Sequence, residues 1–220
     1  HSNFCINFKL FIYFWGYFVR SLSILGSTGS IGCNTLNVVR LHPDKFNIFA
    51  LSSYTNTDLL LDQAIEFRPS VIVTKDEISA KKIYELIKNT YIPEILYGIS
   101  GYRAIASADE ATDIVAAISG SAGLIPTMDA ITHGKRILLA NKEAMVMAGP
   151  LMIDLCSKFN AKLIPVDSEH NAIFQIIHTN SDNNAINKII LTASGGPFRD
   201  FSKDQLLNVT VEEALNHPNW

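Results

Sequence analysis

The stretch Gly26-Ser27-Thr28-Gly29-Ser30-Ile31-Gly32 decides the fold predicted for this chain. It follows Leu22 to Leu25, a short apolar run typical of a buried strand, and precedes Cys33 to Arg40, where apolar residues recur at helical spacing. A glycine turn before a helix suits phosphate, because unpaired backbone N–H groups and the positive end of the helix dipole face the anion. We therefore expect these seven residues to bind a nucleotide cofactor. The spacing Gly-x-x-Gly-x-x-Gly is not the commoner Gly-x-Gly-x-x-Gly, so an ordinary structural turn remains an alternative.

Outward from this turn, strands alternate with helices as far as Val166. Such alternation implies a parallel sheet covered on both faces. The predicted fold class is therefore α/β, a doubly wound parallel sheet forming a Rossmann-like NADP-binding domain. The expected strands are Leu22 to Leu25, Phe46 to Leu51, Val71 to Thr74, Ile95 to Tyr97, Ile114 to Ile118, Ile137 to Leu139 and Lys162 to Val166.

The composition changes beyond Asp167, where we expect one helix near Ala172 to His178 and a strand at Ile189 to Thr192. The predicted domains are a leader of uncertain origin (1–20), the NADP-binding domain (21–166) and the start of an incomplete, truncated α+β catalytic domain (167–220). The aromatic run within residues 3–18 is interrupted by Lys9 and is shorter than the ~20 apolar residues of a spanning helix, so we expect no membrane partner.

The bulk composition narrows the function classes. The 220 residues are 48% apolar and 18% charged with a net charge of −3, and no basic stripe marks a nucleic-acid binder. The three cysteines lie far apart, which argues against a disulfide framework or a thiolate zinc site and favours a reducing compartment.

The end of the second expected strand bears on the choice of cofactor. A carboxylate that binds the ribose diol of NAD is usual there, but the chain has Ser52-Ser53-Tyr54-Thr55-Asn56. Hydroxyl and amide groups tolerate a 2′-phosphate better, which favours NADP and makes Ser52 and Asn56 candidate contacts. This loop contains no Arg or Lys to pair with the phosphate.

A second polar string, Asn141-Lys142-Glu143, follows the strand at Ile137 to Leu139. Open α/β sheets present ligand-binding residues at such strand ends, and a bound anion would explain Lys142. On spacing alone, a solvated helix start with Glu143 in the first turn is the alternative.

Asp167-Ser168-Glu169-His170-Asn171 follows the last strand of the sheet. Two carboxylates at i and i+2 around a turn can converge on a hard cation such as Mg²⁺ or Mn²⁺. A helix N-cap at Asp167 or Ser168 is an equally good interpretation of the same residues.

Two further strings offer groups for a phosphorylated substrate. Ser194 lies in a Ser-Gly-Gly turn that can present N–H and hydroxyl donors to phosphate, and the chain ends with His217-Pro218-Asn219-Trp220, whose Trp220 could cover a ligand. An ordinary turn and a core tryptophan are the alternatives.

Taken together, these strings resemble 1-deoxy-D-xylulose 5-phosphate reductoisomerases in both order and separation. The resemblance covers roughly Ser21 to Trp220. It rests on the glycine turn, Leu139-Ala-Asn-Lys-Glu143, Pro165-Val-Asp-Ser-Glu-His-Asn-Ala-Ile-Phe-Gln175, Ala193-Ser-Gly-Gly-Pro-Phe198 and His217-Pro-Asn-Trp220.

The resemblance implies conversion of 1-deoxy-D-xylulose 5-phosphate to 2-C-methyl-D-erythritol 4-phosphate in the non-mevalonate isoprenoid pathway, with NADPH and Mg²⁺ or Mn²⁺. It implies that Asp167 and Glu169 ligate the metal and, with Lys142, form the catalytic group. Asn141 and Glu143 would join the cofactor site. The implied substrate contacts are Lys142, Ser168, Glu169, Ser194, His217 and Trp220.

The family habit also implies a homodimer, in the bacterial cytoplasm or in a plastid if the source is eukaryotic. Family members continue past the final Pro-Asn-Trp into a segment with a third metal carboxylate, so we expect this chain to be a fragment and incomplete as a catalyst. Another NADP-dependent reductase, of the aspartate-semialdehyde or dihydrodipicolinate type, is one alternative. A nucleotide-binding fragment without turnover is another.

Overall fold

The computed structural model describes residues 19–179, 186–190 and 196–216. They divide into two compact units at the junction of Asp167 and Ser168, and each unit is described by itself. Residues 1–18 of the expected leader and three candidate substrate residues (Ser194, His217 and Trp220) lie outside the described residues. Arg20, the last residue of the expected leader, begins the first strand of the sheet, so that strand starts two residues before the expected Leu22.

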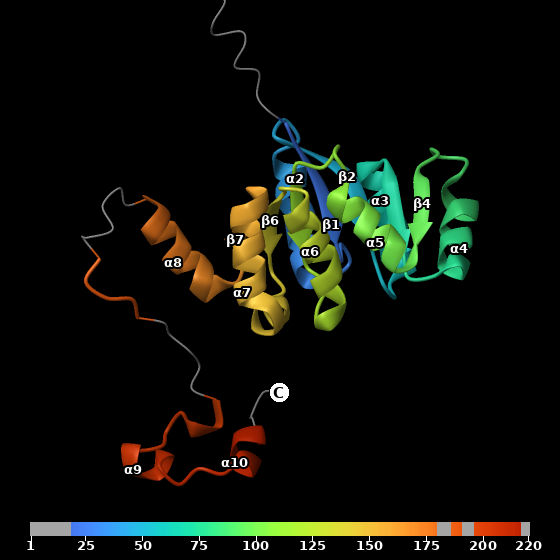
Figure 1. Cartoon of the computed structure of the whole chain (residues 1–220). Coiled ribbons are helices and arrows are strands. Elements are labelled where there is room, and N and C mark those ends of the chain that lie inside the picture. The colour runs from blue at the N-terminus through green and yellow to red at the C-terminus, as the bar shows by residue number, and fades with distance from the viewer. Residues whose placement is uncertain (1–18, 180–185, 191–195, 217–220) are drawn as a thin grey trace, which may run out of the picture. The chain divides into compact units, whose positions relative to one another are not determined.

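The first unit is a seven-stranded parallel sheet with helices on both faces (Figure 1), which confirms the predicted doubly wound α/β fold of this part of the chain. The strand order is β4-β3-β2-β1-β5-β6-β7. The direction of winding reverses between β1 and β5, and this is the switch point at which doubly wound sheets hold their ligands. The strands are β1 (Arg20–Leu25), β2 (Phe46–Ser52), β3 (Val71–Thr74), β4 (Glu94–Tyr97), β5 (Asp113–Ala116), β6 (Arg136–Leu139) and β7 (Lys162–Pro165).

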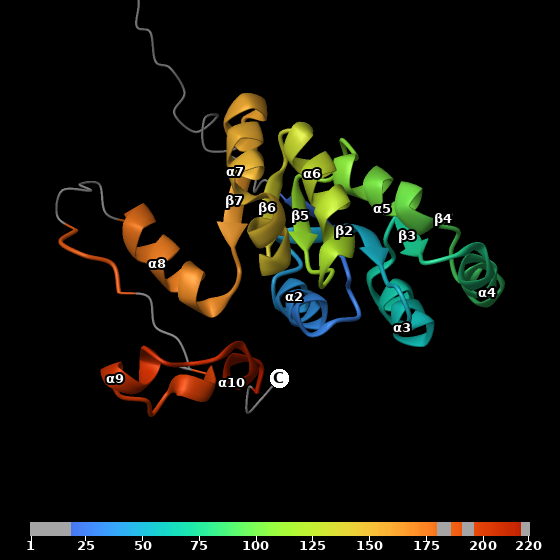
Figure 2. The same cartoon turned by 60° about the horizontal axis from the view of Figure 1, so that its bottom comes forward.

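Helices cover both faces of the sheet (Figure 2). On one face α2 (Ser30–Leu41), α3 (Thr57–Phe67) and α4 (Glu77–Ile87) bury aliphatic side chains such as Leu36, Leu60 and Ile83. On the other face α5 (Gly98–Ser107), α6 (Leu124–Thr132), preceded by the short helix η1 (Ser121–Gly123), and α7 (Lys142–Phe159) form a separate cluster that includes Ile105 and Ile131. Strands covered on both sides need apolar residues at successive positions, which explains why the runs at β1, β3 and β5 are buried throughout or nearly so.

A buried ionic cluster fixes the amino-terminal edge of the sheet. The Asp113 carboxylate at the start of β5 has no exposed surface and forms ion pairs with Arg20, at 3.2 Å, and with Arg136. The Thr112 hydroxyl donates to the same carboxylate at 2.8 Å. The first residues of β1, β5 and β6 are thereby held in register at the edge opposite the glycine turn.

The second unit contains short helices. They are α8 (Ser168–Thr179), η3 (Gly196–Phe198), α9 (Lys203–Leu206) and α10 (Val211–Leu215). The helix expected at Ala172 begins four residues earlier, at Ser168. Ile189 and Ile190, placed in a strand by the sequence, have no regular structure, and the rest of that predicted strand lies outside the described residues. A strand needs a hydrogen-bonded neighbour, and the described part of this unit contains none.

Within the described ranges, no helix has both the length and the apolar composition needed to cross a bilayer.

Candidate functional site

The glycine turn joins β1 to α2 at the carboxyl edge of the sheet. Gly26 has φ +86°, a conformation that glycine adopts without strain, and a Cβ there would lie 2.9 Å from the Ala117 carbonyl oxygen. The Gly26 N–H donates to the Ser52 hydroxyl at 3.0 Å, and that hydroxyl donates to the Ile24 carbonyl at 3.2 Å. Ser52 is fully buried, so its side chain ties the turn to the end of β2. Its expected cofactor contact remains a prediction.

Ser27 turns into the protein rather than toward solvent. Its buried hydroxyl donates to Oε1 of Gln63 in α3 at 2.7 Å, and Nε2 of Gln63 donates to the Ser27 carbonyl at 3.0 Å. The Thr28 and Ser53 hydroxyls lie 2.8 Å apart and share a hydrogen bond. These hydrogen bonds within the protein fix the conformation of the turn.

The start of α2 has the features of an anion site. Gly29 is the N-cap residue; no side chain caps the helix, and no acidic residue lies in its first turn. A Cβ on Gly32 would lie only 2.4 Å from the Gly26 carbonyl oxygen, so glycine is required for α2 to pack against the turn. The N–H groups of the first turn therefore lack a side-chain acceptor and can serve a phosphate.

Two hollows meet at this turn, and both are lined by Gly29, Ala117, Ile118 and Ser119. The larger, of about 690 Å³, extends past Tyr54, Thr55 and Lys75 toward the ends of β2 and β3. The smaller, of about 170 Å³, reaches Asn141, Lys142 and Glu143 beyond β6. The structure thus brings two of the predicted strings together across the switch point between β1 and β5.

Asn141 connects these strings through its side chain. It is 2% exposed, and its Oδ1 accepts from the Ala144 N–H at 2.9 Å, which caps α7. Its Nδ2 donates to the carbonyls of Ile118 at 2.6 Å and Gly120 at 2.9 Å. The Asn141 side chain therefore serves as a helix cap, as the helix-start alternative expects. Lys142 and Glu143 are exposed and line the smaller hollow.

The loop after β2 forms one wall of the larger hollow. Asn56 caps α3, its side chain accepting from the Leu59 N–H at 3.1 Å. The buried Tyr102 hydroxyl of α5 donates to the Ser53 carbonyl at 2.9 Å, and burial raises the pKa of Tyr102 to about 12. The Asn56 contact with a cofactor is untested and remains a prediction.

The two predicted metal ligands follow β7. Asp167 is half-buried just beyond the carboxyl end of this edge strand, and Glu169 is exposed in the first turn of α8. In the part of the chain that the structure describes, no three His, Cys, Asp or Glu side chains form a cluster that could hold a metal ion. A cation bound by Asp167 and Glu169 would need its other ligands from groups other than the His, Cys, Asp and Glu side chains of the described residues.

Sequence reasoning missed three elements of the site: Lys75, Tyr102 and the loop at Ala117 to Ser119. Lys75 and the loop directly follow strands, and that position is the only signal that could have marked them. Tyr102 lies inside a helix pattern and carries no such signal.

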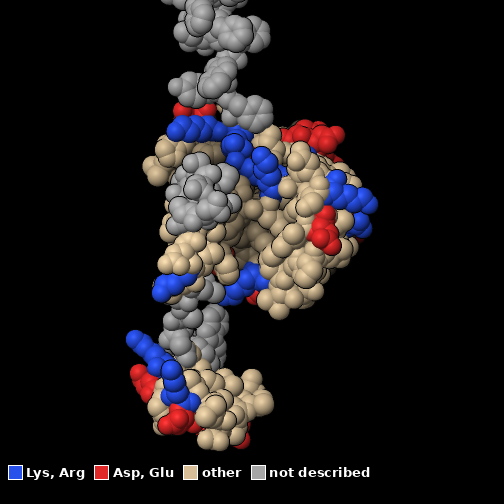
Figure 3. Space-filling model, turned by 60° about the vertical axis from the view of Figure 1, so that its left-hand side comes forward, with Lys and Arg blue, Asp and Glu red and all other residues tan. Residues whose placement is uncertain are grey.

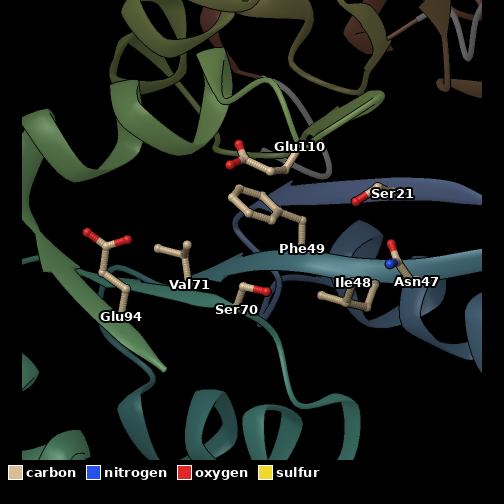
Figure 4. Close-up of a pocket in the computed structure, with 8 residues that line it drawn as sticks. All are labelled: Ser21, Asn47, Ile48, Phe49, Ser70, Val71, Glu94 and Glu110. Carbon is tan, nitrogen blue, oxygen red and sulfur yellow. The ribbon is translucent and has the colours of Figure 1, made fainter. Parts of the chain in front are cut away.

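A different hollow, of about 540 Å³, lies at the amino-terminal edge of the sheet (Figure 4). It is lined by residues such as Phe49, Ser70 and Val71, with the carboxylates of Glu94 and Glu110 at its sides. Two carboxylates repel phosphate, and ligands of open α/β sheets bind at the opposite edge, so we do not place the site here. On the face drawn in Figure 3, acidic and basic side chains are interspersed among the described residues without a continuous basic stripe.

Comparison with known proteins gives a consistent result. The sequence profile of 1-deoxy-D-xylulose 5-phosphate reductoisomerase matches residues 22–149, and that of the reductoisomerase C-terminal domain matches residues 163–220. The reductoisomerase of Pelodictyon phaeoclathratiforme is 52% identical over 204 residues, and that of Lawsonia intracellularis is 48% identical over 203. These matches cover 92% of this chain but 52% and 50% of the relatives, so the chain spans about half their length.

Solved structures give the same picture. A crystal structure of DOX-P reductoisomerase in complex with NADPH, fosmidomycin and magnesium matches with 45% identity and a TM-score of 0.74, over 92% of this chain and 52% of that one. The Zymomonas mobilis enzyme in complex with NADPH matches with 38% identity and a TM-score of 0.76, over 88% of this chain and 50% of that one.

Proposed function

Since the chain belongs to the 1-deoxy-D-xylulose 5-phosphate reductoisomerase family, we propose that it binds NADPH and contributes to the conversion of 1-deoxy-D-xylulose 5-phosphate to 2-C-methyl-D-erythritol 4-phosphate. Because it spans about half the length of its relatives, the complete reaction is proposed for the protein that carries this sequence.

The observation that carries the proposal is the pair of hollows that meet at Gly29. A dinucleotide has two nucleosides joined by a pyrophosphate, and the site has two compartments joined at an uncapped helix start. We assign the pyrophosphate to the start of α2, the adenosine to the hollow beside Tyr54 and the nicotinamide to the hollow beside Lys142. NADPH supplies the hydride for reduction when it is bound there.

For the metal, we propose that Asp167 and Glu169 supply two carboxylates for Mg²⁺ or Mn²⁺. Their oxygen donors match the preference of these hard cations, and a two-carboxylate set leaves coordination positions open for substrate oxygens. The bound cation supplies Lewis-acid polarisation of the substrate carbonyl and hydroxyl.

The remaining assignments concern the substrate. Lys142 is exposed beside the nicotinamide compartment and would offer a cation to the substrate near the transferred hydride. We propose Ser168 for a substrate hydroxyl, Ser194 and His217 for the phosphate, and Trp220 as the cover. We propose a cytoplasmic location because the relatives named above are bacterial, and a homodimer on the family resemblance alone.

The test uses the protein that carries this sequence and measures NADPH oxidation by absorbance. We expect turnover only when deoxyxylulose phosphate and Mg²⁺ or Mn²⁺ are both present, and loss of turnover in Asp167→Asn and Glu169→Gln. Asp154→Asn, which removes an exposed carboxylate from α7, is the matched control and should keep wild-type turnover.

NADPH binding is measured separately by nicotinamide fluorescence. Binding with no turnover under any condition would favour a nucleotide-binding role. Full turnover in either carboxylate variant would disprove the metal assignment.

A further inference from the structure

We propose that Lys75 is the residue that selects NADPH over NADH, by pairing its ammonium group with the 2′-phosphate. The inference rests on the proposed NADPH dependence and assigns the cation that the Ser52 to Asn56 loop lacks.

The position of Lys75 follows from the strand order. It directly follows β3, and β3 lies beside β2, so its side chain emerges at the carboxyl edge next to the loop that reads the ribose in this type of sheet. Lys75 and Thr55 both line the hollow of about 690 Å³ that begins at the glycine turn. Among the described residues that line this hollow, Lys75 is the only charged one.

The Tyr54 ring lies beside the ammonium group at the wall of the hollow. The Lys75 Nζ lies 6.0 Å from the centroid of the Tyr54 ring, at the outer limit of a cation–π contact. The contact is weak, so the ammonium group can move to a phosphate with little loss of cation–π energy.

Three of the other polar side chains near the proposed 2′ position already have partners. The Ser52 hydroxyl bonds to the turn, the Ser53 hydroxyl shares a hydrogen bond with Thr28, and the Asn56 side chain caps α3. A phosphate placed there would bring close to two negative charges, and neutral groups such as the exposed hydroxyl of Thr55 cannot offset them. Lys75 is the group left to do so.

Among the described residues, the negative group paired with Lys75 is Asp76, whose Oδ2 lies 3.6 Å from Nζ. Asp76 is committed to α4: it caps the helix by accepting from the Ser79 N–H at 2.8 Å, and these hydrogen bonds, with a smaller contribution from the Lys75 charge, lower its pKa. The helix dipole offsets part of this carboxylate's charge. An exposed pair of this kind contributes little, so it does not prevent Lys75 from binding phosphate.

The experiment measures the Kd of NADPH and of NADH by nicotinamide fluorescence for the whole chain and its variants. In Lys75→Gln the Kd of NADPH should rise about tenfold, the loss expected for one charge-assisted contact to phosphate, while that of NADH changes less than about twofold. Lys75→Arg should keep the preference. Lys88→Gln removes a lysine of similar exposure, 38% against 41%, from the far end of α4 and should change neither Kd.

Two further measurements test the phosphate directly. Raising the salt concentration should weaken the NADPH preference of the wild type more than that of Lys75→Gln, because screening acts on the ammonium–phosphate pair. Adding Thr55→Lys to Lys75→Gln places a cation elsewhere on the same hollow and should restore the preference.

The outcomes separate this inference from the proposed function. Equal weakening of both nucleotides by Lys75→Gln would mean that Lys75 contacts the shared part of the cofactor, and no change in either would mean that it contacts neither. Both results overturn the inference while leaving the NADPH site standing. A wild-type chain that binds neither nucleotide would overturn the proposed cofactor function and the inference with it.

Discussion

Replacing two glycines of the same turn by alanine should have different effects: Gly32→Ala should lower stability, and Gly29→Ala should weaken NADPH binding. Gly32→Ala places a Cβ 2.4 Å from the Gly26 carbonyl oxygen and 2.5 Å from the Ser27 Cα, about 1 Å inside the 3.4 Å at which ordinary contact begins. The obstructing atoms are backbone, and the contacts of Ser52 and Gln63 hold that backbone in place. Gly29→Ala meets nothing closer than 3.5 Å, and the φ of −78° at Gly29 suits any residue.

The magnitudes follow from these distances. Overpacking a rigid core site costs about 1–3 kcal/mol and occasionally more, so we expect Gly32→Ala to lose about 3 kcal/mol of folding free energy. At about 2–4 °C per kcal/mol, the Tm should fall by about 6–12 °C. Gly29→Ala should leave the free energy of unfolding unchanged or raise it by up to about 1 kcal/mol, because alanine has fewer conformations than glycine in the unfolded chain. Its methyl group faces the proposed pyrophosphate, so its Kd for NADPH should rise roughly 10- to 100-fold for one or two lost charge-assisted hydrogen bonds.

The assay is thermal denaturation followed by circular dichroism, paired with nicotinamide fluorescence for NADPH. The reasoning fails if Gly29→Ala binds NADPH as tightly as the wild type, because the helix start would then not be the pyrophosphate site. A Gly32→Ala variant with wild-type Tm would show that the turn can move apart, contrary to the rigidity argued from its hydrogen bonds.

Three other predictions concern stability. Burial raises the pKa of Tyr91 and Tyr102 to about 12, so the folded state favours the protonated phenols. Their contribution to the free energy of unfolding is complete below about pH 10 and is lost as the pH rises toward 12. Urea unfolding measured across that pH range would detect the loss. Tyr91→Phe should flatten this dependence at little cost, because its hydroxyl has no hydrogen-bond partner among the described residues, and an unchanged pH profile would contradict the assignment. Asp113→Ala should cost about 3 kcal/mol in chemical denaturation, since it leaves two arginines without their buried carboxylate. Asn141→Ala should cost about 2 kcal/mol through the lost cap and speed amide hydrogen exchange at the start of α7; unchanged exchange there would exclude this role.

The sheet could be predicted because its strands carry continuous apolar runs between glycine and polar punctuation. The run at Val71 to Thr74 matches β3 at both ends, whereas the strand expected to reach Ile118 ends at Ala116. The residues after Ala116 leave the strand and line the two hollows of the proposed site, and an apolar run alone does not show where strand pairing stops. The sequence offered a helix start at Asn141-Lys142-Glu143 only as an alternative to a ligand site, and the structure shows α7 beginning at Lys142 with Asn141 as its cap.

The site was only partly predictable. Strand ends collect at one edge of a parallel sheet, so the meeting of the glycine turn with Asn141 could be expected from sequence. Lys75 could not, because its place beside Tyr54 depends on β3 pairing with β2, and spacing along the chain does not give strand order. Nor does a pattern reveal that the Ser52 hydroxyl faces backbone groups. In the sequence, a polar residue at a strand end that binds a ligand cannot be distinguished from one that stabilises the fold.

The missing cap of α2 has a consequence for how the protein senses its cofactor. Side chains cap the starts of α3, α4 and α7, whereas α2, like α5 and α6, begins without a side-chain cap, and its N-cap residue is a glycine. Bound nucleotide would act as the absent cap, so part of the binding energy would appear as protection of the α2 amides and as resistance to unfolding that grows with the logarithm of cofactor concentration. The cellular lifetime of the polypeptide would then follow the NADPH pool.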